Sequence, residues 1–408
     1  MSPLLYGFLA DTWWYALTAR LPDEDFQRLT ELRVSQGFTA AQLVVGIPPE
    51  ITPENPNAAS PYGAAWTRTG EFNQRYLVYA RERIKYLNQT GLSVIVYGAW
   101  GNQITWLGVK RMTEWWKAIL EITADLDVIY CLTGESNLQV GLKDLDVLKR
   151  PTSVLQKIEE QFRRSRFTRR IVNRLFRTAA MTRNHRQAWS QVLEQIAPLT
   201  DKPILIHPNP QEAGFECVDN PCLLAANTAQ TGHTYQARPR LHQLPLAHAA
   251  TQDPAGRGFI NLEPWYEGIR NQFRGADQLY AYWASMLAGA ISYCYGAHGI
   301  WNVGDGNFLG HWGSQTFSQA LALDAPRLLG LSHYLFRPYI DQPANVRVME
   351  RENRLKSIQR KFEGAAITFI PEISEVSEIP AGELWLPMEG RYTDHLPTLG
   401  QVVVISHQ

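Results

Sequence analysis

The feature that most constrains the fold is an alternation of short apolar runs with longer segments of helical periodicity, from residue 4 to about residue 305. Short apolar runs separated by helix-period segments are typical of repeated βα units. Eight runs are present, at residues 4–10, 40–45, 93–97, 128–132, 203–206, 233–236 (a weaker one), 259–262 and 291–295. We therefore expect an α/β fold of the (β/α)8, or TIM barrel, type, although an open doubly wound sheet has similar local patterns. No GxGxxG follows an early run, which weakens a dinucleotide-binding alternative.

Helix boundary signals lie between the apolar runs. The segment 22–35 opens with Pro-Asp-Glu-Asp, which places acidic residues at the positive end of the helix dipole, and Gly37 follows its end. The segments 71–89 and 275–288 also end before a glycine. This regular spacing supports helices that connect successive parallel strands.

Two regions depart from the βα pattern. Residues 149–186 form a basic tract with seven arginines between 163 and 177 and apolar residues at helical spacing, which predicts an amphipathic helical insertion with a solvated face, or else a site for an acidic partner. Beyond about residue 337 short alternating stretches separated by Pro and Gly predict a small C-terminal β-sandwich. We therefore divide the chain into a barrel at 1–336, containing the insertion, and a β-domain at 337–408.

The charge balance bears on the partner. Lysine plus arginine equals aspartate plus glutamate at 39 each, so no net field favours nucleic acid or an anionic membrane. The chain contains 13 Trp and 17 Tyr, many of them in expected loops. Sugar faces pack on such rings, so an uncharged oligosaccharide or polysaccharide is the expected partner.

The four cysteines contain no CxxC pair, and no zinc site or other cofactor is expected. Cys217 and Cys222 could close a short loop as a disulfide, but free thiols are the favoured interpretation. The start of the chain lacks the pattern of a signal peptide, and no apolar run is long enough to span a bilayer, so we expect a cytoplasmic protein without a transmembrane segment. Oligomeric state is not predicted.

In a barrel the reactive groups follow the carboxyl ends of the strands. Here the polar and aromatic residues that follow the apolar runs, and that we expect to meet at one mouth, are Asp11, Trp13, Trp14, Trp100, Asn102, Glu135, His207, Tyr235, Glu263, Trp265, Tyr266, Glu267, His298 and Trp301. Asp11, His207, Tyr235, His298 and Trp301 in particular are predicted to line one pocket.

Two of these residues form a candidate catalytic pair. Glu135 and Glu263 follow the fourth and seventh runs, which would stand on opposing sides of an eight-stranded barrel. Glycoside hydrolysis needs one carboxylic acid to protonate the leaving oxygen and one carboxylate to attack or to activate water. No Cys nucleophile, P-loop or metal-ligand cluster competes with this pair. Glu263, at the strand tip, is a better candidate nucleophile than Glu267, which lies about a helical turn later.

Each residue also has a structural interpretation. A glutamate after a strand can cap a helix or pair with an arginine. The histidines at 207, 233 and 298 are more often orienting or core residues than ligands, and the tryptophans can pack between the barrel and its helices. The position of two glutamates at strands four and seven favours catalysis.

Several motifs resemble the apiosidase-like barrel hydrolases. They are Leu-Ala-Asp-Thr-Trp-Trp at 9–14, Gly-Phe-Thr at 37–39 ahead of Gln42, Thr-Gly-Glu at 133–135, Leu-Glu-Pro-Trp-Tyr-Glu at 262–267 and Tyr-Gly-Ala-His-Gly-Ile-Trp at 295–301. The resemblance implies a retaining enzyme with its acid/base at Glu135 and its nucleophile at Glu263, followed by a small β-domain. Ala10 and the basic insertion depart from the family pattern, and Gly134 stands where the wider clan commonly has an Asn before the acid; these departures bear on the substrate more than on the chemistry.

The sequence thus predicts a retaining glycoside hydrolase. The alternatives are a non-catalytic carbohydrate-binding or scaffold protein on the same barrel, and metal-dependent hydrolysis through the histidines. The sugar, its linkage and the choice between exo and endo action are not predicted.

Overall fold

A computed structural model describes residues 5–138, 179–210 and 212–407 of the chain. Its first sheet has eight parallel strands in the order β5-β4-β3-β2-β1-β8-β7-β6. The strands are β1 (Leu9–Thr12), β2 (Ala40–Val44), β3 (Ser93–Tyr97), β4 (Val128–Cys131), β5 (Ile204–Leu205), β6 (Asn227–Gln230), β7 (Phe259–Glu263) and β8 (Ala290–Tyr295). The predicted TIM-type barrel is confirmed, and the doubly wound alternative is wrong because β1 pairs with both β2 and β8.

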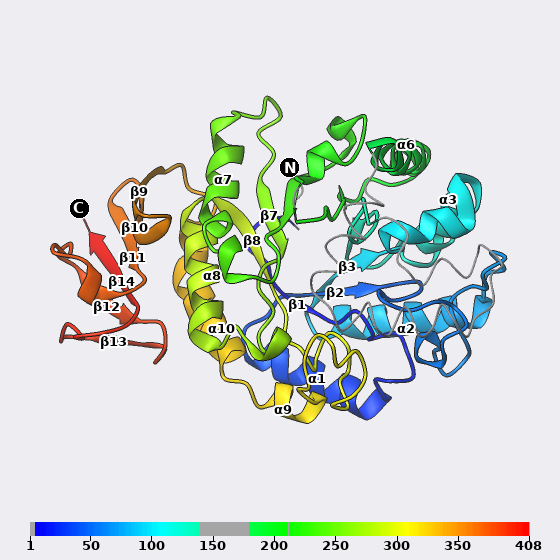
Figure 1. Ribbon diagram of the computed structural model, residues 1–408, viewed down its shortest axis with the longest axis horizontal. Coiled ribbons are helices and arrows are strands. Elements are labelled where there is room, and N and C mark those ends of the chain that lie inside the picture. The colour runs from blue at the N-terminus through cyan, green and yellow to red at the C-terminus, as the bar shows by residue number, and fades with distance from the viewer. Residues whose placement is uncertain (1–4, 139–178, 211, 408) are drawn as a thin grey trace.

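Helices surround the barrel, as Figure 1 shows. They are α1 (Asp23–Ser35), α2 (Gln74–Gln89), α3 (Ile104–Ile122), α6 (Ala179–Ile196), α7 (Arg240–Ala250), α8 (Gly275–Leu287), α9 (Phe317–Leu321) and α10 (Ala325–Phe336). Predicted helix signals are present at α1, whose first turn is acidic, and at α2, where Asn73 caps the Tyr76 N–H at 3.1 Å. Most of the basic insertion, up to residue 178, lies outside the described residues, and its last residues belong to α6.

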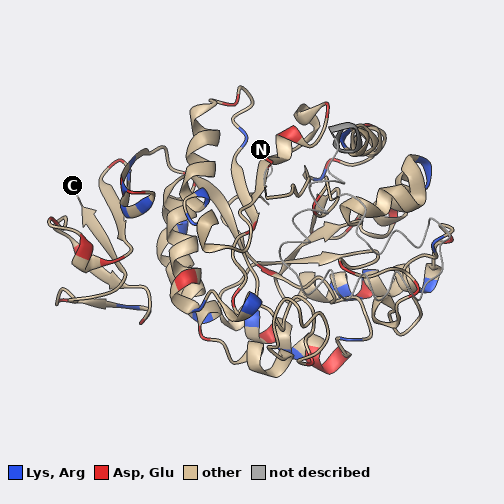
Figure 2. Cartoon of the chain, viewed as in Figure 1, with Lys and Arg blue, Asp and Glu red and all other residues tan. Residues whose placement is uncertain are grey.

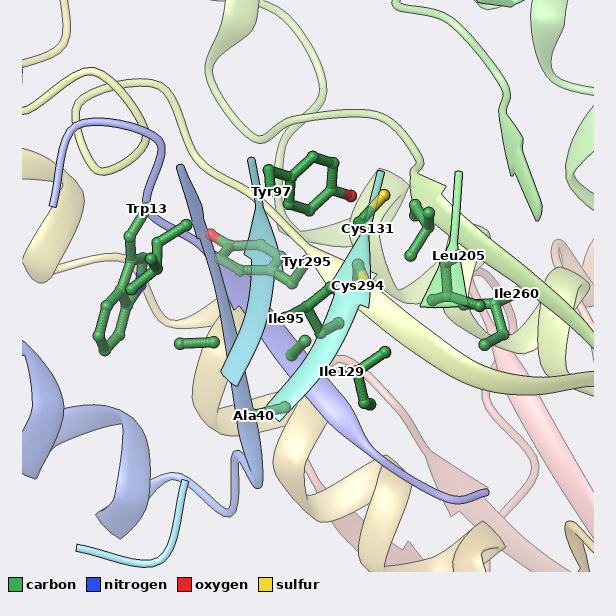
Figure 3. Packing of buried hydrophobic residues seen from close by; sticks show 14 of the residues in the cluster. Trp13, Ala40, Ile95, Tyr97, Ile129, Cys131, Leu205, Ile260, Cys294 and Tyr295 are labelled. Carbon is green, nitrogen blue, oxygen red and sulfur yellow. The ribbon is translucent and has the colours of Figure 1, made fainter. Parts of the chain in front are cut away.

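The barrel interior is filled by large side chains. Tyr97, Cys131 and Tyr295 pack with aliphatic side chains inside the strands (Figure 3), and all three are fully buried. Tyr97 donates its hydroxyl to Gln42 at 2.9 Å, and the Gln42 amide donates to the Leu262 carbonyl at 2.9 Å. These hydrogen bonds hold the backbone of Leu262, the residue before Glu263, from inside the barrel.

The sheet is closed less regularly between β5 and β6 than elsewhere. In the described residues these two strands share no ladder, and β5 is only two residues long. The seam is closed by a hydrogen bond from the Ala225 N–H to the Ile204 carbonyl at 2.9 Å and by the Thr228 hydroxyl on the Ile206 carbonyl. Strand six was predicted at 233–236; this is wrong, because β6 ends at Gln230, before that segment begins.

The C-terminal β-domain is a six-stranded antiparallel sheet, which lies outside α8 and α10 in Figure 1. Its strands are β9 (Asn345–Arg351), β10 (Arg354–Lys361), β11 (Ala365–Ile370), β12 (Glu383–Leu386), β13 (Arg391–Thr393) and β14 (Val402–His407). Phe369 packs on Tyr280 and Trp283 of α8, with ring centroids 6.0 and 6.4 Å apart. A second apolar cluster on Ile370, Val402 and Val404 is covered by the loop 371–382. The predicted boundary at 336/337 falls between α10 and β9.

Charged residues of both signs occur on the described elements that Figure 2 draws. Lys and Arg are interspersed with Asp and Glu over the outer helices (Figure 2), as the equal counts predict. Among the described residues no helix is both long and apolar enough to cross a membrane. All four cysteines are free thiols, as favoured from the sequence.

Candidate active site

A narrow pocket of about 70 Å³ opens at the carboxyl ends of the barrel strands. It is lined by Trp14, Pro49, Glu50, Trp100, Glu135, Gln230, His233, Glu263, Tyr266, Ile269, Trp301 and Trp312. Both candidate catalytic glutamates therefore face the same cavity. Five of the lining side chains are Trp or Tyr, so its walls are aromatic as well as acidic.

Glu263 is the last residue of β7 and is held by two imidazoles. Its Oε1 lies 2.8 Å from His233 Nε2, and its Oε2 lies 3.4 Å from His207 Nε2. The first contact is a short hydrogen bond, and the second is an electrostatic contact at the limit of hydrogen bonding.

The backbone fixes which nitrogen of each imidazole carries the proton. His207 Nδ1 accepts the Glu135 backbone N–H at 3.1 Å, and His233 Nδ1 accepts the Tyr266 backbone N–H at 3.4 Å. A nitrogen that accepts carries no proton, so both neutral rings carry theirs on Nε2. Burial lowers the pKa of His207 to about 4, which keeps that ring neutral. Both imidazoles therefore direct an N–H towards the Glu263 carboxylate.

These donors determine the charge state of Glu263. Burial by itself would raise the pKa of this carboxyl, but the hydrogen bond from His233, the adjacent imidazoles and the Gln230 amide outweigh it and hold the pKa below its usual value. A carboxylate that accepts hydrogen bonds in its charged form stays ionised. Glu263 is therefore an anion at neutral pH.

Glu135 follows β4, on a backbone in the left-handed region with a φ of 42°. Its Oε2 accepts the Trp100 indole N–H at 3.1 Å, and its Oε1 lies 3.4 Å from the Gln230 amide nitrogen. The indole reaches this position because residue 134 is glycine: a Cβ there would lie 2.2 Å from the Trp100 ring. Gly134 thus makes room for the indole that holds Glu135.

Glu135 has the opposite charge preference to Glu263. Burial, together with the negative charges of Glu263 and Glu50, raises its pKa to about 7 despite the hydrogen bonds from Trp100 and Gln230. Two carboxyl groups with pKa values pushed apart by their surroundings are the usual arrangement of a proton donor beside an ionised partner. Near neutral pH Glu135 can therefore still carry a proton while Glu263 is ionised.

Four other predicted residues also line the pocket. Trp14 and Trp100 meet edge to face with centroids 5.2 Å apart, and Tyr266 and Trp301 meet at 6.3 Å. His207 does not line the cavity but touches both glutamates, through the Glu135 N–H and the Glu263 carboxylate. The pocket therefore contains some, but not all, of the residues that were predicted to line it.

The prediction that Asp11 and Trp13 line the pocket is wrong. Asp11 accepts hydrogen bonds from Arg33 Nε at 2.6 Å and from Trp13 Nε1 at 2.8 Å, and all three side chains are buried. Arg33 belongs to α1, so this ion pair joins β1 to the helix outside the barrel. Figure 3 shows Trp13 next to β1 and β2, and its ring packs on Phe26 of α1.

Tyr235 and Trp265 were also predicted at the pocket, and neither lines it. Both pack on Phe273, each with a centroid distance of 4.7 Å, and the Trp265 indole donates to the Thr234 carbonyl at 3.1 Å. They form an aromatic cluster that anchors the loop after β7, with Tyr235 half exposed.

Glu267, His298 and Asn102 likewise lie outside the pocket lining. Glu267 accepts the Tyr295 hydroxyl at 2.7 Å, and burial raises its pKa to about 7. His298 donates its backbone N–H to the Glu267 carbonyl at 2.8 Å and packs its ring on Trp301. Asn102 lies in the turn before α3, where its carbonyl accepts the Thr105 hydroxyl at 2.6 Å. These residues brace the loops rather than face the cavity.

Six lining residues were not predicted as site residues. They are Pro49, Glu50, Gln230, His233, Ile269 and Trp312. His233 was considered mainly as an orienting or core residue, and Gln230 was missed because strand six was placed too late. Glu50 and Trp312 lie in long loops where no periodicity marks a position. Within the described residues no group of three or more His, Cys, Asp or Glu converges as a metal site.

Comparisons with known proteins identify the family and the fold. The family model of the apiosidase-like catalytic domain matches residues 3–337. A solved structure described as a glycoside hydrolase superposes with a TM-score of 0.72 at 14% identity, covering 98% of this chain and 92% of that one. A glycoside hydrolase family 5 structure from Bacteroides vulgatus gives a TM-score of 0.70 at 14% identity, covering 98% of this chain and 88% of that one. The search of curated proteins gives no match.

The two structural likenesses, at low identity, show the fold, whereas the family match shows the family. It covers the whole barrel, including both glutamates of the pocket. The chain belongs to the apiosidase-like family, and it is a glycoside hydrolase.

Proposed function

We propose that the enzyme cleaves glycosidic bonds with retention of configuration, with Glu263 as nucleophile and Glu135 as acid/base. The observation that carries the proposal is the unequal hydrogen bonding of two carboxyls in one pocket, of which Glu263 is buried and Glu135 partly buried. Glu263 faces two imidazole N–H groups, whereas Glu135 accepts one indole N–H and has an amide at a longer distance. The negative charge of Glu263 also raises the pKa of Glu135.

The reaction follows from these charge states. In the first step Glu135 gives its proton to the glycosidic oxygen while a Glu263 oxygen attacks the anomeric carbon, so that the bond to the leaving group breaks and a glycosyl ester forms. In the second step Glu135, now a carboxylate, takes a proton from water as the water oxygen attacks the same carbon. The ester bond breaks, and both side chains return to their initial states.

The aromatic walls of the pocket suit the apolar face of a sugar ring. We propose that Trp14, Trp100, Tyr266 and Trp301 contact this sugar and that His207 positions both glutamates. The apolar faces of the sugar would pack on the aromatic rings, and its hydroxyl groups would point towards the carboxylates. These two kinds of contact would orient the sugar.

Product stereochemistry tests the mechanism. On a panel of 4-nitrophenyl glycosides in both anomeric forms, proton NMR of the first turnovers should show the product anomer with the configuration of the substrate. Initial release of the opposite anomer would assign Glu263 as a general base for water instead. Binding of sugars without turnover on any substrate would select the non-catalytic alternative.

A further inference from the structure

Gln230 lines the pocket, and the mechanism gives it no part in binding the substrate. It is the last residue of β6, it is buried, and its amide nitrogen lies 3.4 Å from Glu135 Oε1. A hydrogen bond from the same amide also contributes to the lowered pKa of Glu263. One terminal amide carries two N–H donors, so it can serve both carboxyl groups. Gln230 therefore lies beside the bond that the two glutamates would cleave.

The backbone holds Gln230 against the strand that carries Glu263. The two residues are partners across β6 and β7, just after an irregularity in the ladder. The next residue, Thr231, donates its N–H to the Glu263 carbonyl at 3.1 Å. A side chain that projects from a strand is held more precisely than one on a loop. The amide of Gln230 therefore has a fixed place relative to the Glu263 carboxylate.

The carbonyl oxygen of this side chain has no hydrogen-bond donor. Gln230 Oε1 is buried and accepts no hydrogen bond from the described part of the chain. The carboxyl groups fix this orientation, because a carboxylate accepts hydrogen bonds and therefore faces the N–H groups of the amide rather than its oxygen. A buried acceptor without a donor costs free energy, which a ligand that supplies the donor recovers. The pocket thus contains an acceptor that calls for a donor on the substrate.

The position of this acceptor identifies the substrate group that it can bind. The anomeric carbon must lie between Glu135 and Glu263, because one protonates its leaving oxygen and the other attacks the carbon itself. The two ring neighbours of that carbon are the ring oxygen, which has no hydrogen to donate, and C2, whose hydroxyl has one. An acceptor on a side chain that contacts both carboxyl groups therefore suits the C2 hydroxyl.

We propose that Gln230 is a specificity-determining residue whose carbonyl oxygen accepts the hydroxyl at C2 of the sugar at the cleaved bond. This inference rests on the proposed function, because it concerns the sugar whose anomeric carbon Glu263 attacks. A site built to bind a hydroxyl rejects the analogue without it, because the buried polar group of the protein is then left unpaired. The substrates are thus sugars with a free hydroxyl at C2.

The test compares each substrate with its 2-deoxy analogue. For every 4-nitrophenyl glycoside that is turned over, the ratio of its kcat/KM to that of its 2-deoxy counterpart is measured in the native enzyme and in Gln230→Met. Methionine keeps the length of the side chain and removes both the carbonyl and the N–H groups. We expect the ratio to fall about tenfold, the scale of one hydrogen bond. The intrinsic reactivities of the two substrates cancel in this comparison, and so does the lost contact with the glutamates.

Trp100→Phe is the matched control. Trp100 also donates to Glu135, at 3.1 Å, but its indole nitrogen cannot accept a hydroxyl. This variant should lower activity and leave the ratio within about twofold of the native value. If circular dichroism shows that Gln230→Met does not fold, Gln230→Asn withdraws the carbonyl by one methylene and should lower the ratio in the same direction. An unchanged ratio in the folded Gln230 variant, or an equal fall in Trp100→Phe, overturns the proposal.

Failure of the proposed function is distinguishable from failure of this inference. If no glycoside is hydrolysed, the proposed function is wrong, and calorimetry with glucose, galactose and their 2-deoxy forms measures the same contact in the native protein and in Gln230→Met. Tighter binding of the hydroxylated sugar by the native protein, with the difference reduced in Gln230→Met, supports the assignment of Gln230. Equal affinities within each pair, or no binding of either member, overturn it.

Discussion

The two walls of the pocket treat a carboxyl group in opposite ways. The wall from β5 to β7 directs N–H groups at Glu263, from the imidazole of His207 after β5 and from that of His233 after β6. The wall from β2 to β4 places Glu135 beside aromatic carbon, one indole N–H and the carboxylate of Glu50. Glu263 is buried whereas Glu135 is partly exposed, so exposure to water does not explain why Glu135 keeps its proton and the difference lies in the neighbours. Placement of hydrogen-bond donors, rather than exposure to water, sets which glutamate is charged.

The largest effect should come from removing the ionised partner. Glu263→Ala should lose on the order of 10⁶-fold in kcat, the scale seen when a catalytic nucleophile is removed. Azide can then occupy the vacated space and attack in its place, so it should restore turnover of an activated aryl glycoside and give a glycosyl azide of inverted configuration. Rates with and without azide, together with NMR of the product, measure this.

Glu267→Ala is the matched control, because Glu267 belongs to the same motif but accepts the Tyr295 hydroxyl outside the cavity. Azide should not rescue it. Rescue of the Glu267 variant alone would move the nucleophile to that residue.

The second effect concerns the protonated partner. With a pKa of about 7, Glu135 loses its proton above neutral pH, so kcat/KM should fall as pH rises through about 7. On the acid side, activity should fall only when Glu263 is protonated, below the usual range of a glutamate. Glu135→Gln should lose about 10²- to 10⁴-fold on substrates with poor leaving groups and should lose the basic limb of the profile. A basic limb that persists in Glu135→Gln would assign it to another group.

The third effect comes from removing one of the hydrogen-bond donors to Glu263. His233→Ala removes the N–H that Glu263 accepts at 2.8 Å. A hydrogen bond to a charged group contributes about 1.5–3 kcal/mol, which corresponds to roughly a 10- to 150-fold loss in kcat/KM. The acid limb of the pH profile should move to higher pH, because the Glu263 carboxylate loses stabilisation. His395→Ala, an exposed residue of the C-terminal domain, is the control, and an unmoved acid limb in His233→Ala would contradict the assigned role.

The smallest effect should be a shift of the pH profile without a large loss of rate in the chemical step. The negative charge of Glu50 is one cause of the raised pKa of Glu135, so Glu50→Gln should lower that pKa and move the basic limb to lower pH by less than about one unit. The pH profile of kcat/KM for a neutral substrate measures this shift. A basic limb that stays in place or moves upward would show that Glu50 does not act on Glu135 through charge.

Sequence reasoning recovered the barrel because most of its strands are apolar, and it failed where a strand is polar. The strand β6 reads Asn-Thr-Ala-Gln, and all four residues are buried. Hydrophobic periodicity cannot find such a strand, because its polar side chains are satisfied inside the protein rather than by water. The prediction at 233–236 therefore missed Gln230 and placed Tyr235 at the mouth.

The side of the strand on which a side chain lies explains the error at Asp11. The first strand was expected at 4–10, so Asp11 was expected just beyond its end. In the structure Asp11 lies within β1 and its neighbour Thr12 faces inward, where its hydroxyl accepts the Gln42 amide at 2.6 Å. Since side chains alternate along a strand, Asp11 faces outward and pairs with Arg33. By contrast, Glu263 was placed correctly because the apolar run before it marks the strand end.

The seam between β5 and β6 has a consequence for how the enzyme is inactivated. His207 follows the short strand on one side of it, and Gln230 ends the strand on the other. Local opening starts where backbone pairing is sparse, so amides along this seam should exchange with solvent before those of β2 and β3. Such an opening would separate His207, whose imidazole contacts both glutamates, from Gln230, whose amide also contacts them. Heat should then abolish turnover before the barrel melts as a whole, which makes activity a more sensitive reporter of barrel closure than circular dichroism.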